Sequence, residues 1–124
     1  MARTATITIN GTTYTLCYST RVLCEVEDKW ENQSVFFEDL IEKVSTRVWF
    51  LALLMQAGAT YDRQLGLEPP TPLTADEIMD STYMEDQETI TSAIMEAMTA
   101  GSKKEVEAKP TSKKANAAKP SAVK

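Results

Sequence analysis

Alternating apolar and polar residues at the start of the chain predict a β-hairpin. Over residues 4–17, isoleucines alternate with threonines, and the alternation resumes after Asn10-Gly11. A two-residue Asn-Gly loop favours a type I′ turn, because both central residues need a positive φ. This turn places Ile7 opposite Tyr14 on an apolar face and leaves threonines on the other face. Since an isolated hairpin is marginally stable in water, the apolar face is expected to pack on helices.

Helical spacing of apolar residues follows the hairpin. Residues 20–30 predict one amphipathic helix, and a second helix is expected to bury a single stripe. That stripe consists of Phe36, Phe37, Leu40, Ile41 and Val44. The next run, Val48–Met55, is apolar all round, which is typical of a helix in the middle of a core, or of a core plus a partner. Gly58 is expected to end this third helix in a left-handed conformation.

The second half of the body is divided by prolines and helix caps. Four glycine and proline positions within Thr60–Pro72 predict a loop. The sequence Thr74-Ala75-Asp76-Glu77 has the form of a capping box and predicts the start of a fourth helix. A last helix is expected from about Glu85 to Ala100, with Gly101 as the residue that ends it.

Charge divides the chain into two parts. The 124 residues carry a formal net charge of −5. After Gly101 there are seven lysines against two glutamates, net +5, which leaves −10 for residues 1–101. The Lys-rich segment has few large apolar side chains, so residues 102–124 are expected to be a disordered basic tail. The predicted fold class is therefore mainly α: an N-terminal β-hairpin packed on a bundle of four to five helices over residues 1–101.

Composition disfavours enzymatic chemistry. The chain has no histidine and only two cysteines, so a His-dependent general base and a structural zinc site are both excluded. Asp76, Glu77 and Asp80 lie in the first turns of one predicted helix, and Glu85, Asp86 and Glu88 open the next, where the helix dipole stabilises negative charge. The glycines are all used in turns or at helix ends, so a phosphate-binding loop is not expected. We therefore expect no enzymatic activity, no metal and no cofactor.

The same features indicate a protein of the cell interior. Two cysteines are too few for a disulfide framework and are expected to be reduced. The first residues lack the apolar segment of a signal peptide. The longest apolar run, Val48–Met55, has eight residues, well short of the roughly 20 that cross a bilayer. No membrane association is expected.

Some apolar residues fall outside the predicted core stripes. Val35 and Met95 lie off the apolar faces of their helices, and Met84 lies at a helix boundary beside Tyr83. Methionine adapts to varied partners, and unburied apolar groups are candidates for an interaction surface. The candidate partner-binding residues are Val35, Phe36, Met84, Met95 and Met98. Together with the all-apolar third helix, they favour a small helical protein that self-associates or covers another chain.

The order of these elements resembles a known family. A hairpin with an Asn-Gly turn (residues 7–14) is followed directly by the helix Thr20–Glu27. An apolar helix then ends near Gln56-Ala57-Gly58, a Pro-rich loop precedes the helix start Leu73–Ile78, and an Ala-rich helix reaches Gly101. Across the folded body, this order resembles the tail assembly chaperones of long-tailed bacteriophages and prophages.

The resemblance implies a function without catalytic residues. Such chaperones bind the tape-measure protein, keep its long helical segments soluble and bring tail-tube subunits to it. This chain would be the short form of a pair whose longer member arises by programmed frameshifting. The resemblance further implies self-association, action in the host bacterial cytoplasm and absence from the mature virion.

Two other functions remain open from the sequence. A structural tail-completion or connector component would instead be present in mature particles. A small DNA-associated regulator would use the basic tail, but that tail lacks arginine and interleaved aromatic residues. We therefore expect no nucleic-acid partner.

Overall fold

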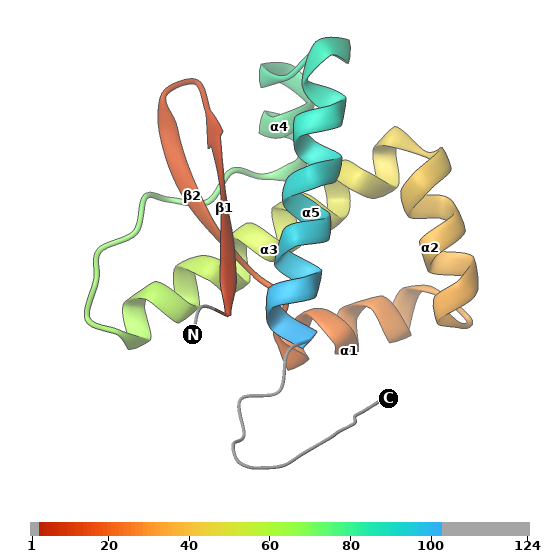
Figure 1. The fold of residues 1–124 in the computed structure, drawn as a ribbon, viewed down its shortest axis with the longest axis horizontal. Helices are drawn as coiled ribbons and strands as arrows, with labels where there is room; N and C mark the ends of the chain where they lie inside the picture. Colours follow the sequence, from red (N-terminus) through yellow and green to blue (C-terminus); the bar gives the residue numbers. More distant parts are fainter. Residues whose placement is uncertain (1–2, 103–124) are drawn as a thin grey trace.

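The computed structural model describes residues 3–102 and is mainly helical (67%) with an N-terminal antiparallel hairpin (Figure 1). The elements in chain order are β1 (Thr4–Ile9), β2 (Thr12–Cys17), α1 (Thr20–Lys29), α2 (Gln33–Glu42), α3 (Val44–Gln64), α4 (Ala75–Ser81), the 3₁₀ turn η1 (Met84–Asp86) and α5 (Gln87–Ser102). The predicted fold class is confirmed. The prediction for residues 103–124 lies outside the described residues.

The hairpin has the predicted register. Ile7 pairs with Tyr14, as the two-residue turn requires. Asn10 has φ 51° and Gly11 φ 83°, the positive values that a type I′ turn needs at both central positions. The apolar face is buried, and both strands pack on α5 while β2 also packs on α3. Burial of one face fixes the register, because a slip of one residue would turn every apolar side chain to water.

Helix α3 lies at the centre of the fold. It runs behind α5 in Figure 1 and contacts β2, α1, α2, α4 and α5. Phe50, Leu51 and Leu54 are fully buried, and Met55 nearly so. The all-apolar run therefore fills the protein's own core from several sides, which is the first of the two explanations that the sequence allowed.

The prediction that Gly58 ends the third helix is wrong. Helix α3 continues through Gly58 to Gln64, and the left-handed residue after it is Gly66, with φ 84°. Gly58 is buried inside the helix, where a Cβ atom would overlap the carbonyl oxygen of Thr15 in β2. Glycine is required there because a strand backbone packs directly on the helix, and this contact is not visible in a local pattern.

The predicted end of the last helix is wrong for the same reason. Gly101 lies within α5, which extends to Ser102. A Cβ on Gly101 would lie 2.7 Å from both Cβ and the carbonyl oxygen of Tyr18. The start also differs, because Glu85 belongs to η1 and α5 begins at Gln87.

An aromatic cluster joins α1, α2 and α3. The ring of Trp30 lies 4.9 Å from that of Phe36 and 5.2 Å from that of Trp49, both edge-on. Phe36 in turn lies 5.0 Å from Phe50. The indole Nε1 of Trp30 donates a 2.9 Å hydrogen bond to Asp39 Oδ2, which satisfies the polar end of this half-buried side chain.

The predicted stripe on the second helix is only partly buried. Phe36 and Leu40 are buried, but Ile41 is 66% exposed and Val44 is 48% exposed. Helix α2 ends at Glu42, and Lys43 adopts an extended conformation with φ −115° and ψ 122°. This break resets the helical phase, so Val44 starts α3 on a different side from the stripe of α2.

The capping box of α4 is present as predicted. Thr74 Oγ1 accepts a 3.1 Å hydrogen bond from the backbone N–H of Glu77, and Glu77 Oε1 accepts a 2.9 Å bond from the backbone N–H of Thr74. Helix α4 then buries Ile78 completely. The cap holds a helix of seven residues that would be too short to be stable alone.

Candidate interaction surface

Exposed apolar side chains gather around a groove at one end of the helical bundle. We call this site, with a volume of about 270 Å³, the apolar groove. It lies where the start of α3, the end of α4, η1 and the start of α5 meet. Its lining residues are Val44, Val48, Met79, Thr82, Tyr83, Met84 and Gln87.

The groove is apolar and open to solvent. Met84 is 89% exposed and Tyr83 is 68% exposed, while Met79 and Val44 are about half exposed. Val48 is buried and forms the floor. Large apolar side chains with this exposure, side by side around one depression, are typical of a surface that another molecule covers.

Hydrogen bonds between side chains and the backbone hold the exposed segment in place. The N–H of Tyr83 donates to Asp86 Oδ2 at 2.8 Å, and Gln87 Nε2 donates to the carbonyl oxygen of Tyr83 at 3.3 Å. These bonds fix the turn before α5 without covering its side chains. Tyr83 and Met84 are therefore presented to solvent on an ordered backbone.

Arg47 of α3 links helix α2 to helix α5 beside the groove. Its Nη1 donates to the carbonyl oxygens of Leu40 and Ile41, at 3.1 and 2.7 Å. Its Nη2 donates to Gln87 Oε1 at 3.4 Å. This half-buried side chain ties the last turn of α2 to the first turn of α5.

The charges around the groove are unevenly distributed. Between Arg63 and Lys103 the chain has no lysine or arginine. The eight acidic residues in this stretch are Glu68, Asp76, Glu77, Asp80, Glu85, Asp86, Glu88 and Glu96. The α4, η1 and α5 side of the groove is therefore purely anionic, while Lys43 and Arg47 lie on its α3 side.

The structure spreads the predicted partner-binding residues over several surfaces. Met84 lines the groove, Val35 is 37% exposed in the first turn of α2, and Met95 is 40% exposed on α5. Met98 is half-buried and packs against the core. Of these residues, only Met84 belongs to the groove, so the five do not form one site.

Phe36 requires a correction as a candidate for partner binding. It is 1% exposed and lies within 5.5 Å, ring to ring, of three other aromatic side chains. A partner cannot reach it in this structure. Phe36 is a core residue, because it fills the space between α2 and α3.

Sequence reasoning missed two of the exposed apolar residues of the groove. Val44 was assigned to a buried stripe, and Met79 received no role. Met79 directly follows the buried Ile78 on a helix of seven residues, too short for a periodic pattern to separate its faces. The available signal was chemical: a methionine on a short capped helix next to Tyr83-Met84.

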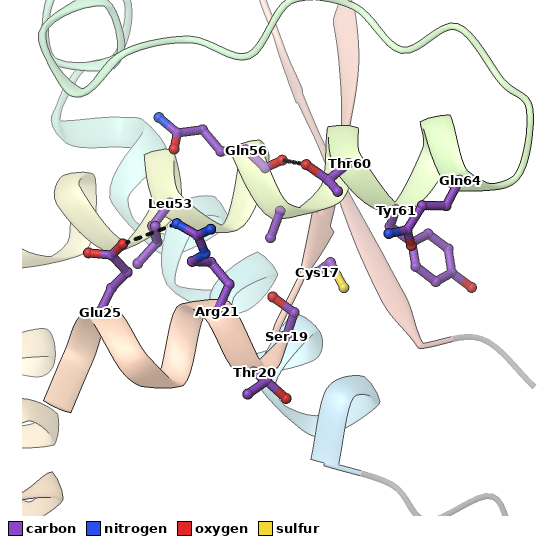
Figure 2. A pocket seen from close by; sticks show the side chains of 11 residues that line it. Cys17, Ser19, Thr20, Arg21, Glu25, Leu53, Gln56, Thr60, Tyr61 and Gln64 are labelled. Atoms are coloured by element: carbon purple, nitrogen blue, oxygen red, sulfur yellow. Dashed lines mark hydrogen bonds and ion pairs between the residues drawn. The ribbon is translucent and has the colours of Figure 1, made fainter.

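A second, larger pocket of about 560 Å³ lies between α1 and α3 (Figure 2). Polar residues outnumber apolar ones in its lining, and Arg21 and Glu25 approach each other there, at 3.8 Å. Cys17 lies in the wall, where burial raises the pKa of its thiol and nearby Arg3 partly opposes this rise. A thiol that stays protonated is a poor nucleophile, so this arrangement does not favour covalent chemistry.

Within residues 3–102, no three His, Cys, Asp or Glu side chains lie close enough together to hold a metal ion. In the same range, none of the helices combines the length and the apolar character needed to span a membrane. No protein-family model, curated protein or solved structure matches the chain.

Proposed function

We propose that this protein is a non-enzymatic tail assembly chaperone of a long-tailed phage or prophage. It binds the tape-measure protein in the host cytoplasm, keeps that protein soluble and promotes assembly of the tail tube around it. The order of sequence motifs over residues 5–101 supports the family. The observation that carries the binding function is the open apolar groove formed by Val44, Met79, Tyr83 and Met84.

The size of the groove indicates weak, reversible binding by each copy. Complete burial of a large apolar side chain contributes about 1.5–3 kcal/mol. Two of the four side chains are already half-buried, and the other two are 68% and 89% exposed, so full coverage contributes at most about 8 kcal/mol before the entropic cost of association. This corresponds to a Kd of about micromolar or weaker. A chaperone that must leave its client benefits from such an affinity.

Weak single contacts also explain why many copies would act together. A long helical client offers repeated apolar stripes, and several copies bound to one chain raise the effective local concentration at the next stripe. The acidic body, net −10 over residues 1–101, keeps the coated complex soluble by charge repulsion. Both functions arise from surface properties and need no nucleotide site.

Co-expression with the tape-measure protein of the same genome tests this proposal. We expect long helical fragments of that protein to precipitate alone and to stay in the supernatant with the chaperone in several-fold molar excess. A chain that leaves the fragments insoluble at every ratio would contradict the proposal. Mass spectrometry of mature particles distinguishes a chaperone from a structural component of the virion, because a tail-completion or connector component would be found there in stoichiometric amounts.

A further inference from the structure

The charged side chains beside the apolar groove indicate which kind of ligand it binds. Asp80 follows Met79 directly, and Glu85 follows Met84. Both carboxylates are exposed, and each belongs to a residue whose Cα atom is about 3.8 Å from that of a residue lining the groove. Charges at this separation act on a molecule bound in the groove, because the Debye length is about 8 Å at physiological ionic strength.

The positive charge near the groove lies on its α3 side. Lys43 pairs with Asp39 at 3.7 Å, whereas Arg47 donates only to the uncharged oxygens of Leu40, Ile41 and Gln87 and keeps its positive charge. The opposite wall, formed by α4, η1 and the start of α5, contains no lysine or arginine, so the exposed charges beside it are negative. The two sides of the groove therefore differ in charge.

We infer that the groove binds an amphipathic helix whose apolar stripe is flanked by lysine or arginine on one side. This inference rests on the proposed function and specifies which segments of the client are bound. Aliphatic side chains at helical spacing would cover Met79, Tyr83 and Met84. The flanking cations would lie near Asp80 and Glu85, so charge complementarity sets the orientation of the helix.

A second copy of this chain fits the groove less well. Its own groove carries the same acidic wall, and two such walls facing each other repel. Within its segment of residues 64–102, which supplies most of the exposed apolar side chains, there is no lysine or arginine to complement the wall.

The Lys-rich segment of this chain also lacks half of the required chemistry. Residues 103–124 contain seven lysines, but Val106 and Val123 are the only residues among them from the group of valine, leucine, isoleucine, methionine and the aromatic residues. These two valines are 17 positions apart, too far to form one stripe on a helix. The segment can supply charge but cannot cover the apolar side chains of the groove.

Labelled synthetic helices test the inference by fluorescence anisotropy with the full chain. The first probe is a peptide of about 16 residues, long enough to be helical, with leucine at i, i+3, i+4 and i+7 and lysine along one flank. The second replaces every lysine with glutamate. The third keeps the composition of the first and scrambles the leucine positions. We expect the lysine peptide to bind about tenfold more tightly than the glutamate peptide, a difference that corresponds to two or three exposed ion pairs. We expect the scrambled peptide to bind at least tenfold more weakly than the lysine peptide, because it lacks the apolar stripe.

Variants locate the binding surface. The double variant Met79→Ser/Met84→Ser should weaken binding of the first probe at least tenfold, whereas Met95→Ser, an exposed methionine on α5 outside the groove, should leave it unchanged. The double variant Asp80→Lys/Glu85→Lys should reverse the preference in favour of the glutamate peptide. A matched variant away from the groove, with Glu27→Lys on α1 and Glu31→Lys just after it, changes the net charge equally and should keep the original preference.

Several results would overturn the inference. Equal binding of the first and third probes would show that charge alone attracts the peptide. If both double charge variants lost the preference for the lysine peptide equally, the preference would come from the net charge of the whole protein and not from the groove. A dimer that Met79→Ser/Met84→Ser dissociates would make a second copy the occupant. Circular dichroism of each variant separates loss of the groove from loss of the fold.

The inference and the proposed function fail in different ways. If the groove variants still keep the tape-measure fragments soluble, the chaperone function stands and the groove is not the client site. If the unmodified protein binds the first probe through the groove but leaves the fragments insoluble, the charge preference stands and the proposed function is wrong.

Discussion

Two apolar regions of this protein differ in side-chain type and have opposite exposure. The first is the cluster where α1 and α2 meet α3, built on Phe36 and Phe50, which are at most 1% exposed. The second is the apolar groove, where Met84 is 89% exposed. The cluster is closed by rings that contact edge-on at 4.9–5.2 Å. The groove instead presents the flexible side chains of Met79 and Met84 to solvent.

The difference separates apolar residues that hold the fold from those available to a partner. Aromatic rings and a glycine against a strand backbone tolerate little change in shape, as expected of a close-packed interior. Methionines adapt their rotamers to what covers them. Stability and binding should therefore respond to different substitutions, and this expectation can be tested from the largest effect to the smallest.

The largest effect is expected in the aromatic cluster. Phe36→Ala should lower the free energy of unfolding by about 4 kcal/mol, because it leaves a cavity among three rings. Met84→Ala, the matched truncation in the groove, should change stability by no more than about 0.5 kcal/mol. Urea unfolding of both variants, compared at unchanged m-value, measures this. Equal losses would mean that the groove belongs to the folded core.

The next effect is expected where α3 meets β2. Gly58→Ala should lower the free energy of unfolding by about 3 kcal/mol, because the new Cβ overlaps the carbonyl oxygen of Thr15 and forces strand and helix apart. The overlap outweighs the roughly 1 kcal/mol by which alanine favours a helix interior. Gly66→Ala is the control, because open space surrounds Gly66 and only its φ of 84° is strained. That variant should lose about 1–2 kcal/mol, and a Gly58→Ala protein as stable as the original would contradict the close packing.

A smaller effect is expected at the cap of α4, which carries one wall of the groove. Thr74→Ala removes the side-chain acceptor for the N–H of Glu77 and should cost about 1 kcal/mol. Thermal unfolding compared with Thr71→Ala, an exposed loop threonine nearby, measures the contribution of the cap. If both variants melt at the same temperature, the capping box does not stabilise the folded protein.

The smallest effect is expected at alkaline pH. Burial raises the pKa of the Cys17 thiol above its ordinary 9.0 and that of the Tyr18 phenol above 10.0. Since the folded state resists losing these protons, their contribution to stability is complete below pH 9 and is lost as the pH rises through the folded-state pKa values. The free energy of unfolding should therefore decline above pH 9.

Replacing Cys17 isolates the contribution of its thiol to this loss of stability at alkaline pH. Cys17→Ala should flatten the slope of stability against pH between 9 and 10, while Cys24→Ala, at an exposed thiol, should leave it unchanged. Denaturant titrations at several pH values measure the slopes. Identical slopes for the two variants would show that the wall around Cys17 is open to water.

Local chemistry made the hairpin and the α4 cap predictable, whereas the helix ends at Gly58 and Gly101 were not. A type I′ turn depends on two adjacent residues, and a capping box on two residues three positions apart. By contrast, Gly58 is required by Thr15, and Gly101 by Tyr18. No window of neighbouring residues contains both partners of such a contact, so a local rule interprets either glycine as a helix end.

The candidate site likewise combines features set by neighbouring residues with features set by tertiary contacts. The sequence alone determined that Met84 lies at a helix boundary and that the body is acidic, because both are properties of the chain itself. Tertiary structure decided that Phe36 is buried and that Val44 joins Met79 and Met84 around one groove. That arrangement depends on Arg47 reaching Gln87, 40 positions away, and on the break at Lys43, which turns α3 away from the direction of α2. A surface assembled from four elements exists only once those elements have packed.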